Sequence, residues 1–135
     1  MTNVSLIPAL IVANFDASLE FYASVLGFQI LAQHENPSSA QLELEGSRLM
    51  IEAQQPDSWV LGELSHPFGR GLNLQIRCTD VDGLRARIDA AGISVYRDIE
   101  SKWYEAEGCR VCDRQFLVAD PDGYLLRFCQ SVAGA

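Results

Sequence analysis

Residues 116–130 read FLVADPDGYLLRFCQ, two mostly apolar runs on either side of Asp120-Pro121-Asp122-Gly123. Asp at the first position, Pro at the second and Gly at the fourth fit a type I turn. The apolar runs at 116–119 and 124–129 are typical of strands bounded by turn residues. The stretch therefore predicts a β-hairpin near the end of the chain.

The second strand of this hairpin contains an arginine between apolar residues. Because side chains alternate across a strand, one face is expected to carry Leu125, Arg127 and Cys129, and the other Tyr124, Leu126 and Phe128. Both faces are mostly apolar, which predicts a central, covered strand. The Arg127 guanidinium stays charged, so it requires a partner there.

Composition places the chain among soluble globular domains. Its 135 residues are 48% hydrophobic and 21% charged, with a net charge of −8. This acidity argues against nucleic acid and anionic membranes as partners, and it either favours a cationic ligand or only keeps the protein soluble. No apolar run is long enough for a membrane span, and the N-terminus lacks the basic segment of a signal peptide. A cytoplasmic location with reduced cysteines is expected.

A weak internal repeat divides the chain into two similar parts. Residues 10–30 (LIVANFDASLEFYASVLGFQI) and 74–95 (LQIRCTDVDGLRARIDAAGISV) each show a strand, an acidic helix cap, a helix and a stop glycine. Asp16 is the predicted cap of the first helix, and Asp80 or Asp82 that of the second. A strand at 93–97 and a long loop to Gln115 are expected next.

This repeat predicts an α+β fold of two βαβββ modules in a single domain, 1–135. The modules span 5–54 and 72–131 and are joined by a connector at 55–71. Each module alone would expose one face of its sheet, and pairing the modules buries that face.

The first helix, SLEFYASVLGF at 18–28, and the closing DPDGYLLRF at 120–128 resemble the vicinal oxygen chelate superfamily. This superfamily contains glyoxalase I, extradiol dioxygenases, and fosfomycin and bleomycin resistance proteins. The resemblance covers most of the chain and implies cupped mixed sheets around a cleft. It does not specify an activity.

Members with a metal bind it through His, Glu or Gln side chains on the first and last strands of each module. In this chain the resemblance places those positions near Ile7, Glu52, Asn73 and Arg127. Only Glu52 is a good ligand for a divalent cation, because Ile7 has no donor atom and Arg127 is a fixed cation. The expectation is therefore that the chain has no metal and no cofactor.

Glu52 and Arg127 occupy corresponding positions in the two modules, in LMIE and YLLR. If the modules pack about a pseudo-two-fold axis, the two side chains can meet in the cleft as a desolvated pair. Alternatively, Arg127 extends to the rim and Glu52 is solvated. Bleomycin resistance proteins are similar in having no structural metal and a comparable final strand.

Aromatic residues near carboxylates suggest where a ligand could bind. The candidates are Trp59, His66 and Phe68 in the connector, and Trp103 and Tyr104 in the predicted loop. Such residues suit a flat or cationic organic ligand, or they cover the open edges of the cleft or a dimer interface.

Other motifs give little chemistry. Cys109 and Cys112 form a CxxC, but it does not open a helix as a redox motif would, and no second pair of ligands completes a zinc site. His34 and His66 have no nucleophile in a known spacing, so no catalytic residue is predicted. Whether Cys109 and Cys112 have another role stays open.

The sequence therefore predicts a metal-free homodimer of the bleomycin resistance type, which sequesters a planar, cationic small molecule and could confer antibiotic resistance. The ligand-binding residues would be Glu52, Trp59, His66, Phe68, Trp103, Tyr104 and Arg127. An alternative is a metal-dependent lyase, isomerase or dioxygenase of the same superfamily. In a third interpretation side chains fill the cleft and the protein is a scaffold or regulator. The sequence does not show whether the modules pair within one chain or between two.

Overall fold

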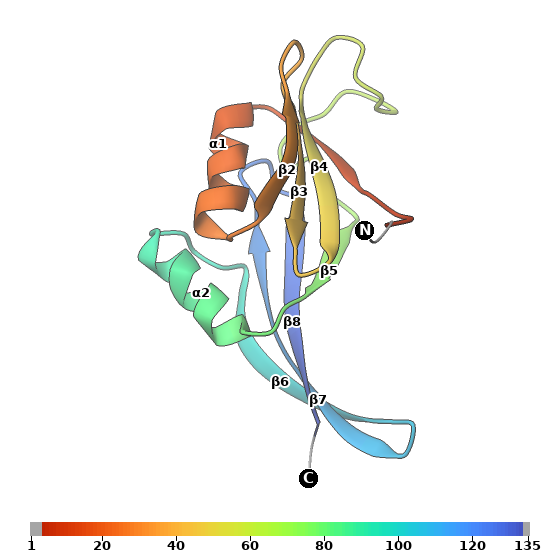
Figure 1. Cartoon of the computed structure of the whole chain (residues 1–135), viewed down its shortest axis with the longest axis vertical. Coiled ribbons are helices and arrows are strands. Elements are labelled where there is room, and N and C mark those ends of the chain that lie inside the picture. The colour runs from red at the N-terminus through yellow and green to blue at the C-terminus, as the bar shows by residue number, and fades with distance from the viewer. Residues whose placement is uncertain (1–3, 134–135) are drawn as a thin grey trace.

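The computed structural model of the protein describes residues 4–133, and the side chains of residues 109–112 and 132–133 lie outside that description. The chain folds into two similar units, shown in Figure 1. The first unit comprises β1 (Ala9–Val12), α1 (Phe15–Leu19), the π-helix η1 (Glu20–Val25), β2 (Gln29–His34), β3 (Ser39–Leu44) and β4 (Ser47–Ala53). The second comprises β5 (Asn73–Arg77), α2 (Val81–Ala90), β6 (Arg97–Ala106), β7 (Cys109–Ala119) and β8 (Leu125–Ala133).

The described strands form two mixed four-stranded sheets with the same topology. Sheet 1 has the order β1-β4-β3-β2 and sheet 2 the order β5-β8-β7-β6. In each sheet the first strand of the unit runs parallel to the last, and the other neighbours are antiparallel. The predicted α+β fold of two βαβββ modules is confirmed.

One face of each sheet contributes to a common hydrophobic core. The buried residues include Leu42 and Ile51 of sheet 1, and Phe116, Leu126 and Phe128 of sheet 2. Helices α1 and α2 lie on the same side of the molecule, at the left of Figure 1. The opposite face of each sheet, here called its outer face, carries Met50 and Glu52 in sheet 1 and Gln75 and Arg127 in sheet 2, by strand alternation.

The turn between β7 and β8 joins the two modules through side-chain hydrogen bonds. Asp120 Oδ2 accepts the Tyr22 hydroxyl at 2.6 Å, and Asp122 Oδ1 accepts the Ala13 N–H at 3.1 Å. The Tyr124 hydroxyl donates to the Ile11 carbonyl oxygen at 2.9 Å. We call Asp120 and Asp122, with these partners, the carboxylate clamp.

The predicted turn at 120–123 is present, and Asp120 also organises it. The Gly123 N–H donates to the Asp120 carbonyl oxygen at 3.0 Å, and Gly123 has a φ of +87° that favours glycine. Asp120 Oδ1 accepts the N–H groups of Asp122 and Tyr124 at 3.0 and 2.8 Å. Burial raises the pKa of Asp120, although these N–H groups and the Tyr22 hydroxyl favour its charged form.

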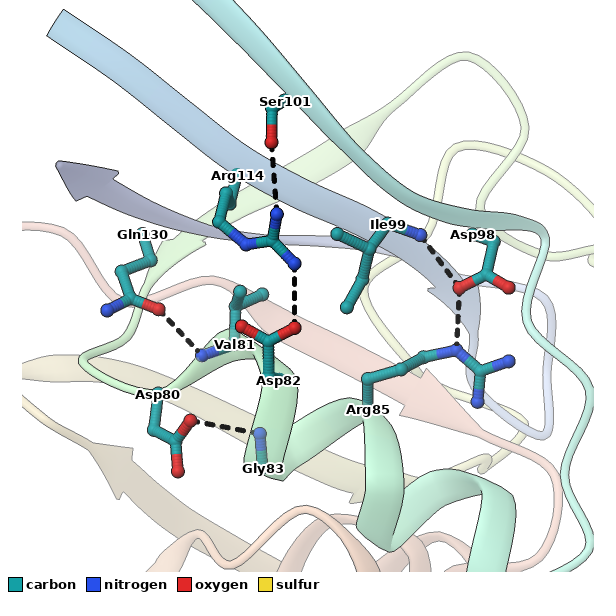
Figure 2. A network of polar contacts seen from close by, with 10 residues as sticks. All are labelled: Asp80, Val81, Asp82, Gly83, Arg85, Asp98, Ile99, Ser101, Arg114 and Gln130. Carbon is teal, nitrogen blue, oxygen red and sulfur yellow. Dashed lines mark hydrogen bonds and ion pairs between the residues drawn. The ribbon is translucent and has the colours of Figure 1, made fainter. Parts of the chain in front are cut away.

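Helix α2 is attached to sheet 2 by polar contacts, shown in Figure 2. The Asp80 side chain accepts the Gly83 N–H at 3.0 Å and caps the helix, so of the two predicted alternatives Asp80 is the cap and Asp82 lies in the first turn. Gln130 Oε1 on β8 accepts the Val81 N–H at 3.0 Å. Arg114 Nη2 on β7 donates to Asp82 Oδ1 at 2.7 Å. These contacts fix the start of α2 against β7 and β8.

Three expectations about local structure are wrong. The cap of α1 is Asn14, whose side chain accepts the Ala17 N–H, and Asp16 lies in the first turn. The strand expected at 93–97 and the loop expected up to Gln115 are replaced by β6 and β7, a long hairpin that projects from the molecule at the lower right of Figure 1. Polar residues on both faces of this hairpin hide the period-two alternation on which the strand prediction depends.

The carboxylate clamp leads to a prediction about stability. Replacing Asp120 with Ala leaves three donors without their acceptor in a buried place, so unfolding should become easier by about 3 kcal/mol. Tyr22→Phe removes one hydrogen bond and should cost about 1 kcal/mol. Chemical denaturation of both variants measures these losses, with Asp89→Ala, an 81% exposed carboxylate, as the control. An Asp120→Ala protein as stable as the control variant would show that the clamp contributes nothing.

Candidate functional site

Glu52 and Trp59 line one hollow at the end of sheet 1. The hollow has a volume of about 200 Å³, and its lining also includes Pro37, Asp57 and Ser58. The Glu52 side chain is half-buried, whereas Trp59 is 99% exposed at the rim. Two carboxylates beside an indole ring are a suitable environment for an organic cation.

Arg127 lies on the outer face of sheet 2, away from this hollow. Its Nη2 donates to Gln75 Oε1 at 2.8 Å, and its Nε is buried without a hydrogen-bond acceptor. The Gln75 amide is oriented by a further contact, from its Nε2 to Cys129 Sγ at 3.3 Å. The partner of Arg127 within the chain is therefore a neutral amide.

The hypothetical Glu52–Arg127 pair does not form within the chain. Among the residues that the structure describes, no ion pair includes either side chain. The two residues lie on the outer faces of different sheets, and both outer faces are turned away from the common core. A pair between two chains stays a prediction.

The other connector candidates lie at the carboxylate clamp. Phe68 is half-buried and packs edge-on against Tyr124, with ring centroids 6.3 Å apart. A Cβ at Gly69 would lie 2.7 Å from Tyr124 Cα, so this part of the connector requires glycine to approach the turn. His66 is exposed next to this contact. The Phe68 side chain thus contributes to packing, and a ligand role for either residue is untested.

Trp103 and Tyr104 belong to strand β6 and not to a loop. Because they are consecutive in a strand, their side chains lie on opposite faces of the hairpin. They are 48% and 41% exposed, and the Tyr104 hydroxyl donates to Asp113 Oδ1 at 3.4 Å. The structure does not bring either residue to the hollow that Glu52 and Trp59 line.

The two cysteines whose side chains the structure describes, Cys78 and Cys129, are not placed as reactive thiols. The side chains of Cys109 and Cys112 lie outside the described residues. Cys78 and Cys129 are free thiols and buried. Burial, followed by the charge of Glu45, raises the pKa of Cys78 to about 11, so this thiol is protonated at neutral pH.

The outer faces can be tested for the metal that the fold family implies. The sequence indicates Ile7 and Asn73 beside Glu52 and Arg127 in such a site, but the strand neighbour of Glu52 is Ile11 and that of Arg127 is Gln75. These four positions offer one carboxylate and one amide, with an apolar side chain and a fixed cation beside them. This donor set does not fit a divalent metal ion. In the part of the chain that the structure describes, no three His, Cys, Asp or Glu side chains gather as a metal site.

Sequence reasoning missed several residues of the Glu52–Trp59 hollow and of the surroundings of Arg127. Asp57 and Ser58 join the hollow only because the connector folds back over the end of β4. Gln75 could have been identified, since the alternation of β5 places Asn73, Gln75 and Arg77 on one face.

No helix among the described residues is long and apolar enough to cross a membrane.

Comparisons with known proteins agree with this geometry. A family model described as the glyoxalase/bleomycin resistance protein/dioxygenase superfamily matches residues 6–128. A superfamily member from Vibrio splendidus 12B01 is 34% identical, over 92% of this chain and 96% of that one, with a TM-score of 0.43. No curated protein matches the chain.

Two further solved structures show the same fold at lower identity. TioX from Micromonospora sp. ML1 is 20% identical over 96% of this chain and 100% of its own, with a TM-score of 0.72. A glyoxalase/bleomycin resistance protein/dioxygenase from Nocardioides is 20% identical over 100% of this chain and 89% of its own, with a TM-score of 0.67.

The donor set predicts that the fold does not depend on a metal ion. Dialysis against a chelator should leave the melting temperature unchanged, because neither outer face has enough ligand side chains to hold a metal ion that the chelator could remove. Differential scanning calorimetry before and after dialysis measures this. A lower melting temperature that zinc, manganese or iron restores would contradict the interpretation of the donor set.

Proposed function

Because the chain belongs to the glyoxalase/bleomycin resistance protein/dioxygenase superfamily, we propose that it is a metal-free small-molecule binding protein of the bleomycin resistance type. It holds a planar, cationic organic molecule without converting it. Sequestration of a toxic compound in this way would confer resistance on a cell. The observation that carries the proposal is the hollow formed by Glu52, Asp57 and Trp59.

The chemistry of this hollow favours a flat cation over a neutral ligand. The Trp59 ring can stack on a planar group and attract a positive charge through its π face. Glu52 is half-buried, so solvent screens its charge less than that of an exposed carboxylate. The net charge of −8 also attracts cations to the protein surface.

Binding without conversion is supported by the lack of reactive groups at the hollow. Its lining contains no histidine, cysteine or lysine, and the nearby outer face does not fit a metal ion. Ser58 has a hydroxyl that accepts the Gln55 N–H at 2.8 Å, and among the described residues no hydrogen bond joins it to the Glu52 or Asp57 carboxylate, either of which would have to act as its base.

We further propose a homodimer in the cytoplasm. Within one chain, the outer faces of sheets 1 and 2 are directed away from their common core. In a symmetric dimer, the outer face of sheet 1 can lie opposite the outer face of sheet 2 of the partner. Such a cleft would place a ligand between the Glu52–Trp59 hollow and the partner's second sheet.

The proposal predicts binding of (naphthalen-1-yl)methylammonium, a planar ring with one positive charge. Trp59→Ala should weaken this binding by about 1–2 kcal/mol, because a cation–π contact and buried ring area are lost. Glu52→Gln should weaken it as well and reduce its dependence on salt. Isothermal titration calorimetry of each variant measures the effect.

Trp103→Ala is the control, since it removes the other tryptophan, which is 48% exposed and lies in the hairpin. Its affinity should equal that of the natural chain. A larger loss from Trp103→Ala than from Trp59→Ala would move the site to the hairpin, and a lack of binding by the natural chain would reject the proposed function.

A further inference from the structure

Three arginines lie on the outer face of sheet 2, one on the central strand β8 and one on each edge strand. Arg127 of β8 is the strand neighbour of Gln75 on β5 and of Leu117 on β7, and Leu117 in turn neighbours Arg97 on β6. Directly paired residues of adjacent strands share a face. Arg77 follows Gln75 by two positions and therefore lies on this face too. We call Arg77, Arg97 and Arg127 the arginine face.

In the part of the chain that the structure describes, the arginine face forms no ion pair, although Glu45 lines a hollow together with Arg77. The ion pairs among the described residues involve Arg48, Arg85 and Arg114, and none includes a member of the arginine face. Arg77 donates to the Ser131 hydroxyl, which is neutral. The chain has 18 acidic and only 10 basic residues. Even so, none of the described carboxylates forms an ion pair with Arg77, Arg97 or Arg127.

The carboxylates nearest in register are engaged by neutral groups. Glu100 Oε1 accepts the Gln115 amide at 3.3 Å. Asp113 Oδ1 accepts the Ser131 hydroxyl at 2.8 Å and the Tyr104 hydroxyl at 3.4 Å. Acidic side chains are thus present on the sheet without forming ion pairs with the three arginines.

Arg127 is the best positioned of the three for a ligand. A guanidinium has five N–H donors, and the structure gives Arg127 one acceptor, Gln75 Oε1. Its Nε is buried and has no acceptor. Because Gln75 is itself held by Cys129 at 3.3 Å, the Arg127 side chain has a fixed neighbour on one side. A planar anion can accept two parallel hydrogen bonds from the terminal nitrogens of the guanidinium.

We propose that the arginine face binds the carboxylate of a small aromatic molecule, with Arg127 as the principal contact. The inference rests on the proposed small-molecule binding and extends it, since the ligand would carry an anionic group in addition to the cationic one. Arg77 and Arg97 raise the local positive potential, so a carboxylate is selected in spite of the negative net charge.

Naphthalene-1-carboxylate is the probe that tests this inference, because it shares its ring with the ammonium probe and has the opposite charge. The natural chain should bind it, and Arg127→Gln should weaken binding by about tenfold or more, because both parallel hydrogen bonds lose their charged donor. The carboxylate affinity of Arg127→Lys should lie between those of the natural chain and Arg127→Gln, since lysine keeps the positive charge but lacks the planar pair of N–H donors. Arg97→Gln, at an exposed position, should weaken binding less.

Arg85→Gln is the matched control. It makes the same change of charge on α2, where Arg85 pairs with Asp98, and should leave the carboxylate affinity unchanged. Melting temperatures of all variants exclude unfolding as the cause of a loss. Equal carboxylate affinity in Arg127→Gln and the natural chain would overturn the inference.

Three outcomes separate the inference from its rivals. If Arg127→Gln dissociates a dimer, measured by analytical ultracentrifugation, and leaves the affinity per chain unchanged, the arginine face binds a carboxylate of the partner chain and the inference is wrong. Binding of the ammonium probe without the carboxylate would reject the arginine face alone. Binding of the carboxylate without the ammonium would instead reject the Glu52–Trp59 hollow.

Discussion

The hydrogen bond from the Tyr22 hydroxyl to Asp120 is the contact on which the arrangement of the two modules depends. It joins residues 98 positions apart and is buried. Burial and the charge of Asp120 raise the pKa of Tyr22 well above its usual value, so the hydroxyl remains a donor. Together with the contact of Asp122 to Ala13, it holds the β7–β8 turn against the first helix.

This constraint determines which sheet faces are available for function. The clamp and the common core keep the helix-covered faces of both modules together. The outer faces then remain for ligands or a second chain, and they differ in charge. Sheet 1 ends at the hollow of Glu52, Asp57 and Trp59, and sheet 2 carries the arginine face. A ligand held between such surfaces would have both a cationic and an anionic group.

The sequence was sufficient for the fold and for the faces of the strands. The turn at 120–123 and the central position of the last strand follow from local rules, since turn residues and alternation are encoded within a few positions. The same rules leave the cap of α2 open between Asp80 and Asp82. Glu45-Gly46 and Glu107-Gly108 both have positive φ angles, so a turn at the second Glu-Gly could have indicated the β6–β7 hairpin.

The candidate site was less predictable, because periodicity gives the face of a residue and not its neighbours across the molecule. Glu52 and Trp59 were named separately, and the structure shows that they share a hollow. Arg127 was expected to need a partner, but alternation alone could not choose Gln75 over Glu52. The sequence predicts a loop around Trp103, because the polar residues on either side of it show no strand pattern, whereas the structure has a strand there.

The central claim is that the carboxylate clamp makes the two modules one cooperative unit. Native-state hydrogen exchange of the Ile51 amide in β4 and the Phe128 amide in β8 tests it most directly, since each lies in the core of a different module. We expect both amides to exchange only through global unfolding, with the same free energy as denaturant unfolding. Two different free energies, with one module opening while the other stays protected, would contradict the account.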